Sequence, residues 1–492
     1  MQNSNSKIKL QQLFGSHWSM VIIILLTPLL LYAVLPILPT HDDWAGTTKP
    51  DFNPFFIKEH FLFYGYHWRP FDTWIGYIVG RNPQVLWPAF NHILVVIGHL
   101  LCSLAVYRLL TVLGFDKNAR NISTFFFFIT PATMATVTAI DSQNQVYALT
   151  CDVIAFLLYI KLKRRKYFVW ISLIFLATLF KENGLMWAWI CPILAYGFNL
   201  IDKKTLKKDL IIGTAIMAGY ALAIILLPKD ITIHPEYVPD DFKIIKNFVK
   251  FLFLSFVTVD YIYLLHNPSR NLVLAVISFL LAAPFLYYVF IHRIKLFAHK
   301  QMICTCICLL IAVAPHIGTV FSMMHIYAGL AMIAIIIAYT IKHLQFTSLP
   351  LGGLGWVPIA FSLWIISALL IDIHLIDASI KSGLIGKQMA QEAIQKTGQP
   401  VKRVYVIIIE DDYPKISSFC VIPNEAFGWG LAAQYETNYQ WPETIQDTTI
   451  IRTPSSMKQA KDLGSKVLKK NLYDCIWIVD HHNIHVIKHL QY

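Results

Sequence analysis

The chain has 492 residues, of which 56% are hydrophobic and only 14% are charged, with a mean hydropathy of +0.54. These proportions exclude an ordinary soluble domain and indicate an integral membrane protein. The formal charge of +12 resides in short Lys and Arg clusters between apolar runs, a pattern that argues against nucleic acid as a partner.

Apolar runs long enough to cross a bilayer predict about eleven transmembrane helices. They lie near residues 18–39, 86–110, 121–138, 145–161, 167–180, 184–200, 209–227, 271–291, 301–318, 325–342 and 355–373. The first run is too long for the core of a cleaved signal peptide, so residues 1–17 are expected to be a cytoplasmic N-terminus. The segment 248–265 is apolar too, but a further crossing would place the cluster at Arg293 on the outside. We therefore interpret it as interfacial or re-entrant.

Basic clusters orient these spans. They follow the fourth, sixth and eighth predicted spans, at residues 161–166, 203–208 and 293–300. By the positive-inside rule these loops are cytoplasmic, and the alternate loops, including the long first loop at residues 40–85, are extracytoplasmic. The bare cytoplasmic N-terminus and the apparent absence of complex-sorting signals favour a bacterial inner membrane as the expected location.

Beyond the membrane domain, residues 18–378, the composition becomes polar. Strand-like runs at 404–409, 475–479 and 485–487 and a helix-like stretch at 456–470 predict a small α/β domain over residues 379–492. An odd number of spans from a cytoplasmic N-terminus places this domain outside the cytoplasm. There, Cys420 and Cys475 could form a disulfide, whereas the other six cysteines lie in apolar runs and suit packing.

The first external loop begins with His41, Asp42 and Asp43 and later contains His67, Trp68 and Arg69. Two adjacent carboxylates at a membrane surface repel each other unless a cation, a metal or a substrate proton offsets them. An Arg between aromatic rings suits phosphate, because its guanidinium binds two oxygens at once. Both elements have plainer interpretations, as the polar end of a span and as an aromatic belt at the interface.

Three further connections carry polar residues on the same side. Lys181 and Glu182 occupy a very short turn between two spans, where a mutual ion pair is the simplest interpretation. Asp141 lies in a polar stretch at 141–145 that also suits a solvated loop. His316 and His325 flank the connection between the ninth and tenth spans, and each alone would more often be a satisfied interfacial residue.

In this order and on one side, these elements resemble the GT-C superfamily of membrane glycosyltransferases, and within it the protein O-mannosyltransferase-like branch, glycosyltransferase family 39. The resemblance covers about residues 18–345. It rests on an ordered set of elements: Asp42 and Asp43 after the first span, Trp68 to Pro70, the polar turn at 141–145, the Lys181–Glu182 turn, and His325 to Tyr327 at the start of a late span. Where that branch often opens a late span with Arg-Tyr, this chain has His325, Ile326 and Tyr327.

The resemblance implies transfer of a sugar from a polyprenyl-phosphate carrier to a hydroxyl of a lipid, glycan or protein acceptor outside the cytoplasm. An acceptor hydroxyl needs a general base, which we assign to Asp43 or Asp42, with a slight preference for Asp43. The leaving phosphate needs fixed cations. The remaining assignments are Arg69, Lys181 and His325 as phosphate ligands, and Glu182, His67 and Asp141 as acceptor-binding or orienting residues. Glu182 would orient Lys181 or contact the acceptor.

The same residues bear on whether the protein binds a cofactor and on which alternative functions stay open. Asp42 and Asp43 permit a divalent metal, which some members of the superfamily use, but the sequence contains no compact ligand set. A nucleotide-sugar donor is disfavoured because no glycine-rich phosphate loop is present. The alternatives are a lipid-linked oligosaccharide flippase or transporter, for which charges near mid-membrane are typical, and a polysaccharide polymerase or ligase.

Overall fold

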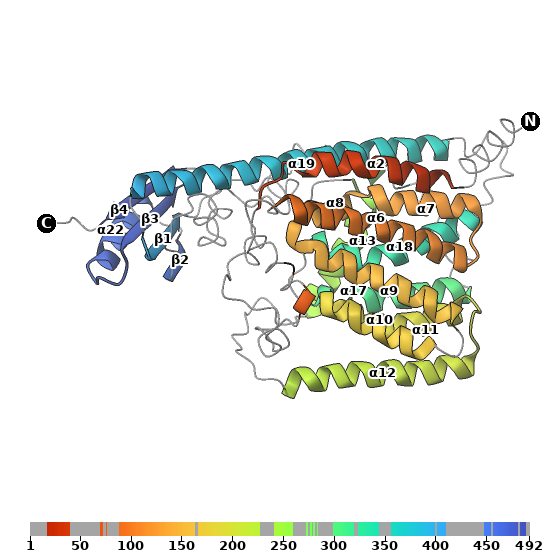
Figure 1. The fold of residues 1–492 in the computed structure, drawn as a ribbon. Coiled ribbons are helices and arrows are strands. Elements are labelled where there is room, and N and C mark those ends of the chain that lie inside the picture. The colour runs from red at the N-terminus through yellow and green to blue at the C-terminus, as the bar shows by residue number, and fades with distance from the viewer. Residues whose placement is uncertain are drawn as a thin grey trace, which may run out of the picture.

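The protein is a bundle of long helices with a small β-sheet beyond one end (Figure 1). The computed structural model describes residues 17–39, 69–71, 75, 88–162, 166–226, 241–258, 272–273, 276–277, 279–280, 283, 299–318, 323–343, 356–398, 401–409, 447–453, 456–480 and 483–488.

The helices of the bundle follow the apolar runs of the sequence. They are α2 (Trp18–Val34), α6 (Ala89–Val112), α7 (Lys117–Ile129), α8 (Pro131–Val137), η2 (Ile140–Ser142), α9 (Gln143–Lys161), α10 (Lys166–Phe180), η4 (Glu182–Met186), α11 (Trp187–Gly197), α12 (Lys203–Leu226), α13 (Asp241–Phe256), α17 (Lys300–Ile317), η6 (Met323–Ile326), α18 (Tyr327–His343) and α19 (Trp356–Thr397). Each predicted span coincides with one or two of these helices, except 271–291, most of which lies outside the described residues.

Four segments of the described chain are long and apolar enough to cross a bilayer by themselves: Ala89–Val112, Lys300–Ile317, Met323–His343 and Phe361–Thr397. Shorter apolar helices, Trp18–Val34 and Tyr167–Phe180, accompany them. These helices support a membrane protein, while the number of about eleven spans stays a prediction.

Proline divides the span predicted at 121–138 into two helices. Asp116 caps α7, its carboxylate accepting from the backbone N–H of Asn118 at 2.9 Å and of Ala119 at 3.0 Å. Thr130 ends that helix in an extended conformation, as the residue before a proline prefers. Pro131 then opens α8, where its missing N–H costs nothing.

Burial is distributed as expected for a bundle in lipid. α18 lies at the centre of the bundle, in contact with α7, α17, α6 and α9. Within Met323–His343, 83% of the residues in the most apolar stretch are buried inside the protein. Leu25 and Leu29 on α2 and Ile211 and Ile225 on α12 are large apolar side chains that point outward. A soluble protein rarely exposes so much apolar surface, whereas hydrocarbon solvates it.

α13 occupies the first half of the segment predicted to be interfacial. The helix has two faces, with Phe251 and Leu254 buried and Phe242, Ile245 and Val249 exposed. It contacts the bundle through α17, where Asn247 Nδ2 donates to the backbone oxygen of Ile317 at 2.9 Å. Whether this segment crosses the membrane stays a prediction, because residues 259–265 lie outside the described part.

α19 joins the bundle to the C-terminal sheet. Its 42 residues correspond to about 63 Å at 1.5 Å per residue, roughly twice the thickness of the hydrocarbon core. The expected domain boundary between residues 378 and 379 therefore falls inside one continuous helix. Gly383 lies against Leu38, which follows α2 in the chain. The C-terminal half of α19 thus extends beyond that end of the bundle (Figure 1).

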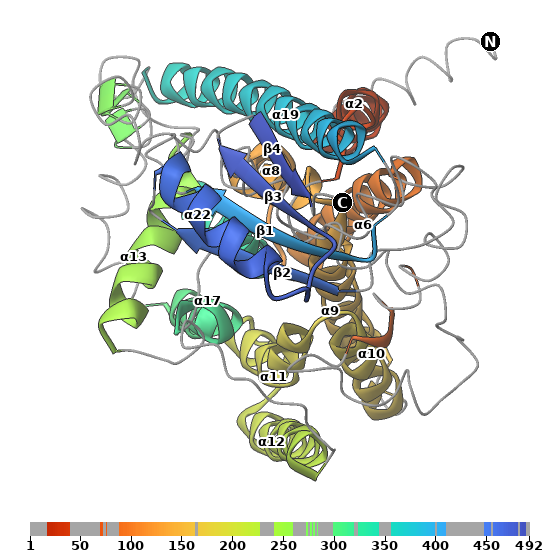
Figure 2. The same cartoon turned by 90° about the vertical axis from the view of Figure 1, so that its left-hand side faces the viewer.

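The C-terminal domain is a four-stranded sheet in the order β2-β1-β3-β4, built from β1 (Arg403–Ile409), β2 (Asp447–Thr453), β3 (Cys475–Asp480) and β4 (Asn483–Lys488). β1 runs parallel to β2 and β3, and β4 is antiparallel to β3. The end of α19 covers one face, where Ala393 and Ile394 pack with Val406 and Trp477. α22 (Met457–Leu468) covers the other face (Figure 2). Helices on both faces of a mostly parallel sheet make this an α/β domain.

Candidate functional site

The candidate site begins at a tight turn between α10 and η4. The backbone N–H of Lys181 donates to Ala177 O at 2.9 Å, and that of Gly184 donates to Lys181 O at 3.0 Å. A Cβ on Gly184 would lie 2.7 Å from Ala177 Cβ and 2.9 Å from the Ala177 carbonyl carbon, so the turn closes only around a glycine. It holds Lys181, which is 6% exposed, at the end of the bundle.

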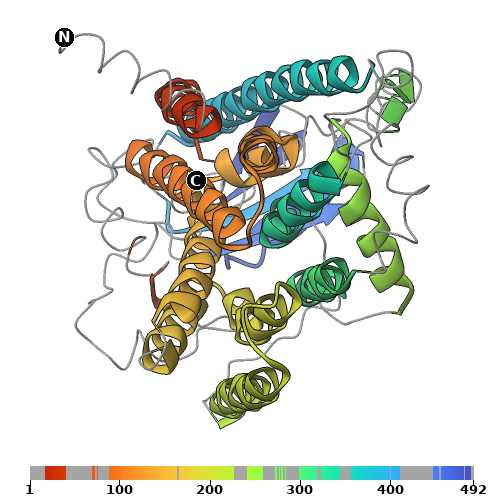
Figure 3. The ribbon, with the colours of Figure 1, turned by 90° about the vertical axis from the view of Figure 1, so that its right-hand side faces the viewer.

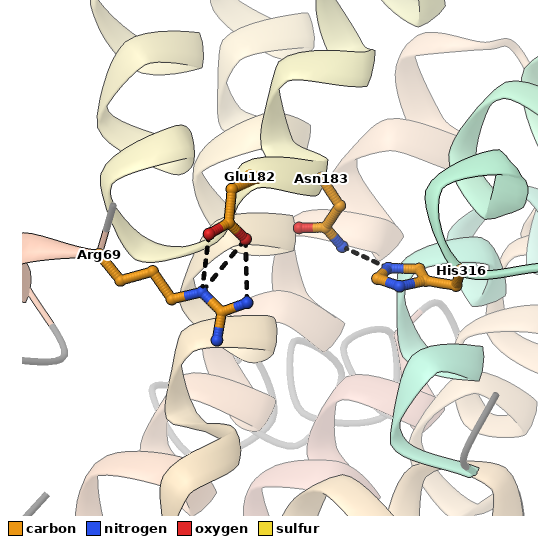
Figure 4. A network of polar contacts seen from close by, with 4 residues as sticks. All are labelled: Arg69, Glu182, Asn183 and His316. Atoms are coloured by element: carbon orange, nitrogen blue, oxygen red, sulfur yellow. Dashed lines mark hydrogen bonds and ion pairs between the residues drawn. The ribbon is translucent and has the colours of Figure 1, made fainter. Parts of the chain in front are cut away.

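Glu182, the next residue in this turn, forms an ion pair with Arg69 (Figure 4). Arg69 Nε donates to both carboxylate oxygens at 3.1 Å, and Nη2 donates to Oε2 at 3.0 Å. The side chains are 22% and 26% exposed. The simplest interpretation of the sequence paired Glu182 with Lys181, whereas the ion pair with Arg69 links the turn to the segment between α2 and α6.

Two histidines lie on the other side of the turn. Asn183 Nδ2 donates to His316 Nε2 at 3.4 Å (Figure 4), and the rings of His316 and His325 stack with centroids 4.4 Å apart and an interplanar angle of 14°. His316 lies in the last turn of α17 and His325 in η6. Arg69, Lys181, Glu182, Asn183, His316 and His325 are called the polar cluster below.

Tyr327, which opens α18 directly after η6, anchors this arrangement in the core. It is fully buried, and its hydroxyl lies 2.9 Å from His99 Nδ1 of α6. The other ring nitrogen of His99 contacts the backbone oxygen of Phe128 at 3.1 Å. Tyr327 is thus tied to α6 and α7, and His325 is the member of the His-Ile-Tyr element that joins the polar cluster.

The structure brings together four of the predicted site residues, Arg69, Lys181, Glu182 and His325. Asp141 lies in η2, beside the cluster, because neighbouring Ser142 contacts the sulfur of Met324 at 3.6 Å; the Asp141 side chain is not among the described atoms. Asp42, Asp43 and His67 lie outside the described residues, as does Cys420, the expected disulfide partner of buried Cys475.

Charge in the polar cluster is biased towards cations. Arg69, Lys181 and Glu182 lie close enough to His316 to interact with it electrostatically. One carboxylate and two fixed cations leave a net positive charge in a partly dehydrated setting, which favours an anion such as phosphate. In the described part of the chain, no three His, Cys, Asp or Glu side chains are grouped as a metal site requires.

Asp152 is a buried carboxyl beside the polar cluster that was not predicted from the sequence. Asp152 is 2% exposed in the middle of α9, and it lines a cavity of about 10 Å³ together with Asn183, Trp187 and Ala312. Asp152 Oδ1 and Asn183 Oδ1 are buried acceptors without a hydrogen-bond donor among the described residues. The cavity has about the volume that one water molecule requires. The sequence signal that could have indicated Asp152 is its position as the lone acidic residue inside the apolar run 145–161.

Comparison with known proteins adds no family assignment. The chain matches no protein-family model, and no curated protein sequence matches it. Inference about function therefore starts from the motifs and the polar cluster.

Proposed function

We propose that this chain is a membrane glycosyltransferase that moves a sugar from a polyprenyl-phosphate carrier to an acceptor hydroxyl on the extracytoplasmic face. The observation that supports it most is the polar cluster, in which the first external loop, the α10–η4 turn, α17 and η6 contribute side chains to one place. In this proposal the chain has about eleven spans, lies in a bacterial inner membrane, and carries its C-terminal domain outside the cytoplasm.

Lys181 and Arg69 bind the donor phosphate in this proposal. Cleavage of the bond between the sugar C1 and the phosphate oxygen leaves additional negative charge on the phosphate. Cations already held in place stabilise that charge without reorganisation. Glu182 fixes the plane of the Arg69 guanidinium through the forked contact, and His325 completes the phosphate site. The expectation that Glu182 orients Lys181 or contacts the acceptor stays a prediction.

The acceptor is activated by Asp43, with Asp42 as the other candidate base. The carboxylate takes the proton of the acceptor hydroxyl as its oxygen attacks C1 of the sugar. Both aspartates belong to the same external loop as Arg69, which reaches the polar cluster. His67 and Asp141 are proposed to bind the acceptor, and a divalent metal at the aspartate pair remains part of the proposal to test.

A transporter of lipid-linked sugars is the second candidate, and Asp152 favours it. An ionisable residue inside a membrane helix is typical of proton- or ion-coupled transport. The charged residues of the polar cluster, in contrast, lie at helix ends, as in an enzyme whose chemistry takes place at the membrane surface. A polymerase or ligase with a diphosphate-linked donor would use the same cationic residues and differs in the donor that it accepts.

Binding of the carrier tests this proposal separately from turnover. Purified protein in detergent is titrated with a synthetic polyprenyl phosphate and with the matching polyprenol. We expect the wild type to prefer the phosphate, and Lys181→Met to lose about tenfold of that preference. Lys342→Met is the matched control, because Lys342 lies at the opposite end of α18 from η6 and contacts the backbone of Gly114. Equal losses in both variants would contradict a phosphate site at Lys181.

A further inference from the structure

A second polar site lies at the other end of the bundle from the polar cluster. It is a cleft of about 790 Å³ formed by the end of α9, the start of α10, the start of α12 and the loop before α12. Figure 3 views the molecule from this end. α10 separates the two sites, with Tyr167 of its first turn in the cleft and Lys181 directly after its last residue. Its 15 residues correspond to about 22 Å.

The cleft presents cations. Lys204 and Lys208 line it from consecutive turns of α12, and Lys208 Nζ lies 4.8 Å from the centre of the Tyr167 ring. On the loop before α12, the side chain of Asn199 accepts a hydrogen bond from Lys300 Nζ at 3.0 Å. The cleft is therefore built from several elements and has ammonium groups on one wall.

The nearby carboxylates are already engaged. Asp202 Oδ1 accepts from the backbone N–H of Thr205 at 2.7 Å and so caps α12. Asp209 is fully buried and accepts hydrogen bonds from the hydroxyls of Tyr159 and Tyr167. Hydrogen bonding leaves these carboxylates charged, so Asp202 in the lining offsets one of the two ammonium groups, and the lining keeps a net positive charge from Lys204 and Lys208.

Apolar surface continues from the cleft along the helices. Phe168, the residue after Tyr167, is 79% exposed, and Ile211, one turn beyond Lys208 on α12, is 71% exposed. In a membrane protein such side chains face the hydrocarbon. A ligand that fits cationic and apolar surface together is amphiphilic, with an anionic headgroup and acyl chains.

We propose that this cleft binds the phosphate headgroup of an anionic phospholipid, such as phosphatidylglycerol, in the leaflet beside the basic ends of α9 and α12. Basic pockets between membrane helices bind anionic headgroups through their Lys and Arg side chains. Lys204 and Lys208 contact the phosphate, Thr205 and Asn199 border the polar part, and the acyl chains lie along α10 and α12. This site is independent of the proposed sugar transfer.

Native mass spectrometry of the full chain in detergent tests the proposal with dioleoyl phosphatidylglycerol and dioleoyl phosphatidylcholine. The wild type is expected to bind the anionic lipid at least about tenfold more tightly, and Lys204→Gln/Lys208→Gln to lose that preference. Lys203→Gln/Lys207→Gln is the matched control, because it removes the same charge at the same spacing from the same helix without altering the lining of the cleft. The control is expected to keep most of the preference.

Two results would overturn the proposal. Equal effects of the two double variants, or no preference for the anionic lipid in the wild type, would show that general charge rather than the cleft attracts lipid. Displacement of the lipid by millimolar inorganic phosphate would show a site for a free anion. Thermal unfolding of each variant without added lipid confirms that a loss of binding does not reflect a loss of fold.

Discussion

Arg69 and Glu182 lie 113 positions apart in the sequence and meet in a forked ion pair at the end of the helical bundle. One residue belongs to the long segment between α2 and α6, and the other belongs to the turn after α10. The pair fixes part of that loop next to Lys181 and the two histidines. A loop carrying Asp42 and Asp43 is thereby tied to the cations that we propose bind the donor.

Replacing Glu182 by Gln is expected to lower sugar transfer about tenfold or more, because a guanidinium displaced by an ångström no longer meets the phosphate. The thermal unfolding midpoint should change little, since a partly exposed ion pair contributes about 1 kcal/mol or less. Glu392→Gln is the matched control, because it removes the ion pair with Lys396 on α19, where N and O are 2.5 Å apart. Transfer that is equally reduced in both variants would contradict the role of Glu182.

Gly184→Ala is expected to destabilise the protein by about 1–3 kcal/mol, because the new methyl group meets Ala177 and the turn cannot close. Gly219→Ala on α12 supplies the contrast. A Cβ there has no heavy atom within 4 Å, so the substitution should stabilise the helix by about 0.5–1 kcal/mol. Thermal unfolding in detergent measures both, and a neutral Gly184→Ala would contradict the tight turn.

Asp152→Asn separates the enzyme from the transporter. In the enzyme, the amide fills the same space and adds a hydrogen-bond donor to a cavity lined by the Asn183 acceptor, so sugar transfer should stay within a few-fold of wild type. In a proton-coupled transporter the same change removes a titrating carboxyl and abolishes pH-driven translocation. Assays of transfer in detergent and of translocation in proteoliposomes at two pH values distinguish the outcomes.

Asp474 gives the C-terminal domain a pH dependence. Burial alone would raise the pKa of its carboxyl. The carboxylate accepts hydrogen bonds from the backbone N–H groups of Arg403 and Lys402 and from the Arg403 guanidinium, and together these donors lower the pKa. The ionised Asp474 carboxylate therefore stabilises the folded C-terminal domain fully above the unfolded-state pKa of about 3.9. This stabilisation is lost as the pH falls through the lower folded-state pKa. Hydrogen exchange at the start of β1 should be faster in Asp474→Asn at neutral pH, with the difference from wild type shrinking in acid. A difference that is independent of pH would contradict this account.

The sequence predicted those helices and strands that a local hydrophobic pattern defines. The β-branched run at 404–409 is a strand because its side chains fill both faces of a sheet. β2 was missed, since its sequence DTTIIRT has only two adjacent apolar residues and no alternation. The second half of α19 was not predicted as a helix, because the last predicted span ended at residue 373. Its charges instead form exposed pairs four residues apart, such as Lys381 with Asp377 at 2.6 Å, which suit a solvated helix.

The polar cluster could be predicted from the sequence only in part, because some of its contacts depend on the packing of helices that are distant in the sequence. Lys181 and Glu182 share a turn between two helices, so their proximity follows from the sequence. The pairing of Glu182 with Arg69 and the stacking of His316 on His325 depend on how α10, α17 and η6 pack. Neither a hydropathy pattern nor a charge pattern contains that information. Asp152 was missed because one carboxyl hardly changes the hydropathy of an apolar run.

The most direct test of the central claim is transfer of radiolabelled sugar from synthetic polyprenyl-phosphate donors by the purified protein. Wild type is compared with Asp42→Asn, Asp43→Asn and Arg69→Ala, each checked for folding by its thermal transition. The account predicts turnover or donor hydrolysis in the wild type that collapses in Arg69→Ala and in one aspartate variant, Asp43→Asn first. Absence of turnover and of binding over a broad donor panel, together with movement of lipid-linked oligosaccharide across proteoliposomes, would contradict it.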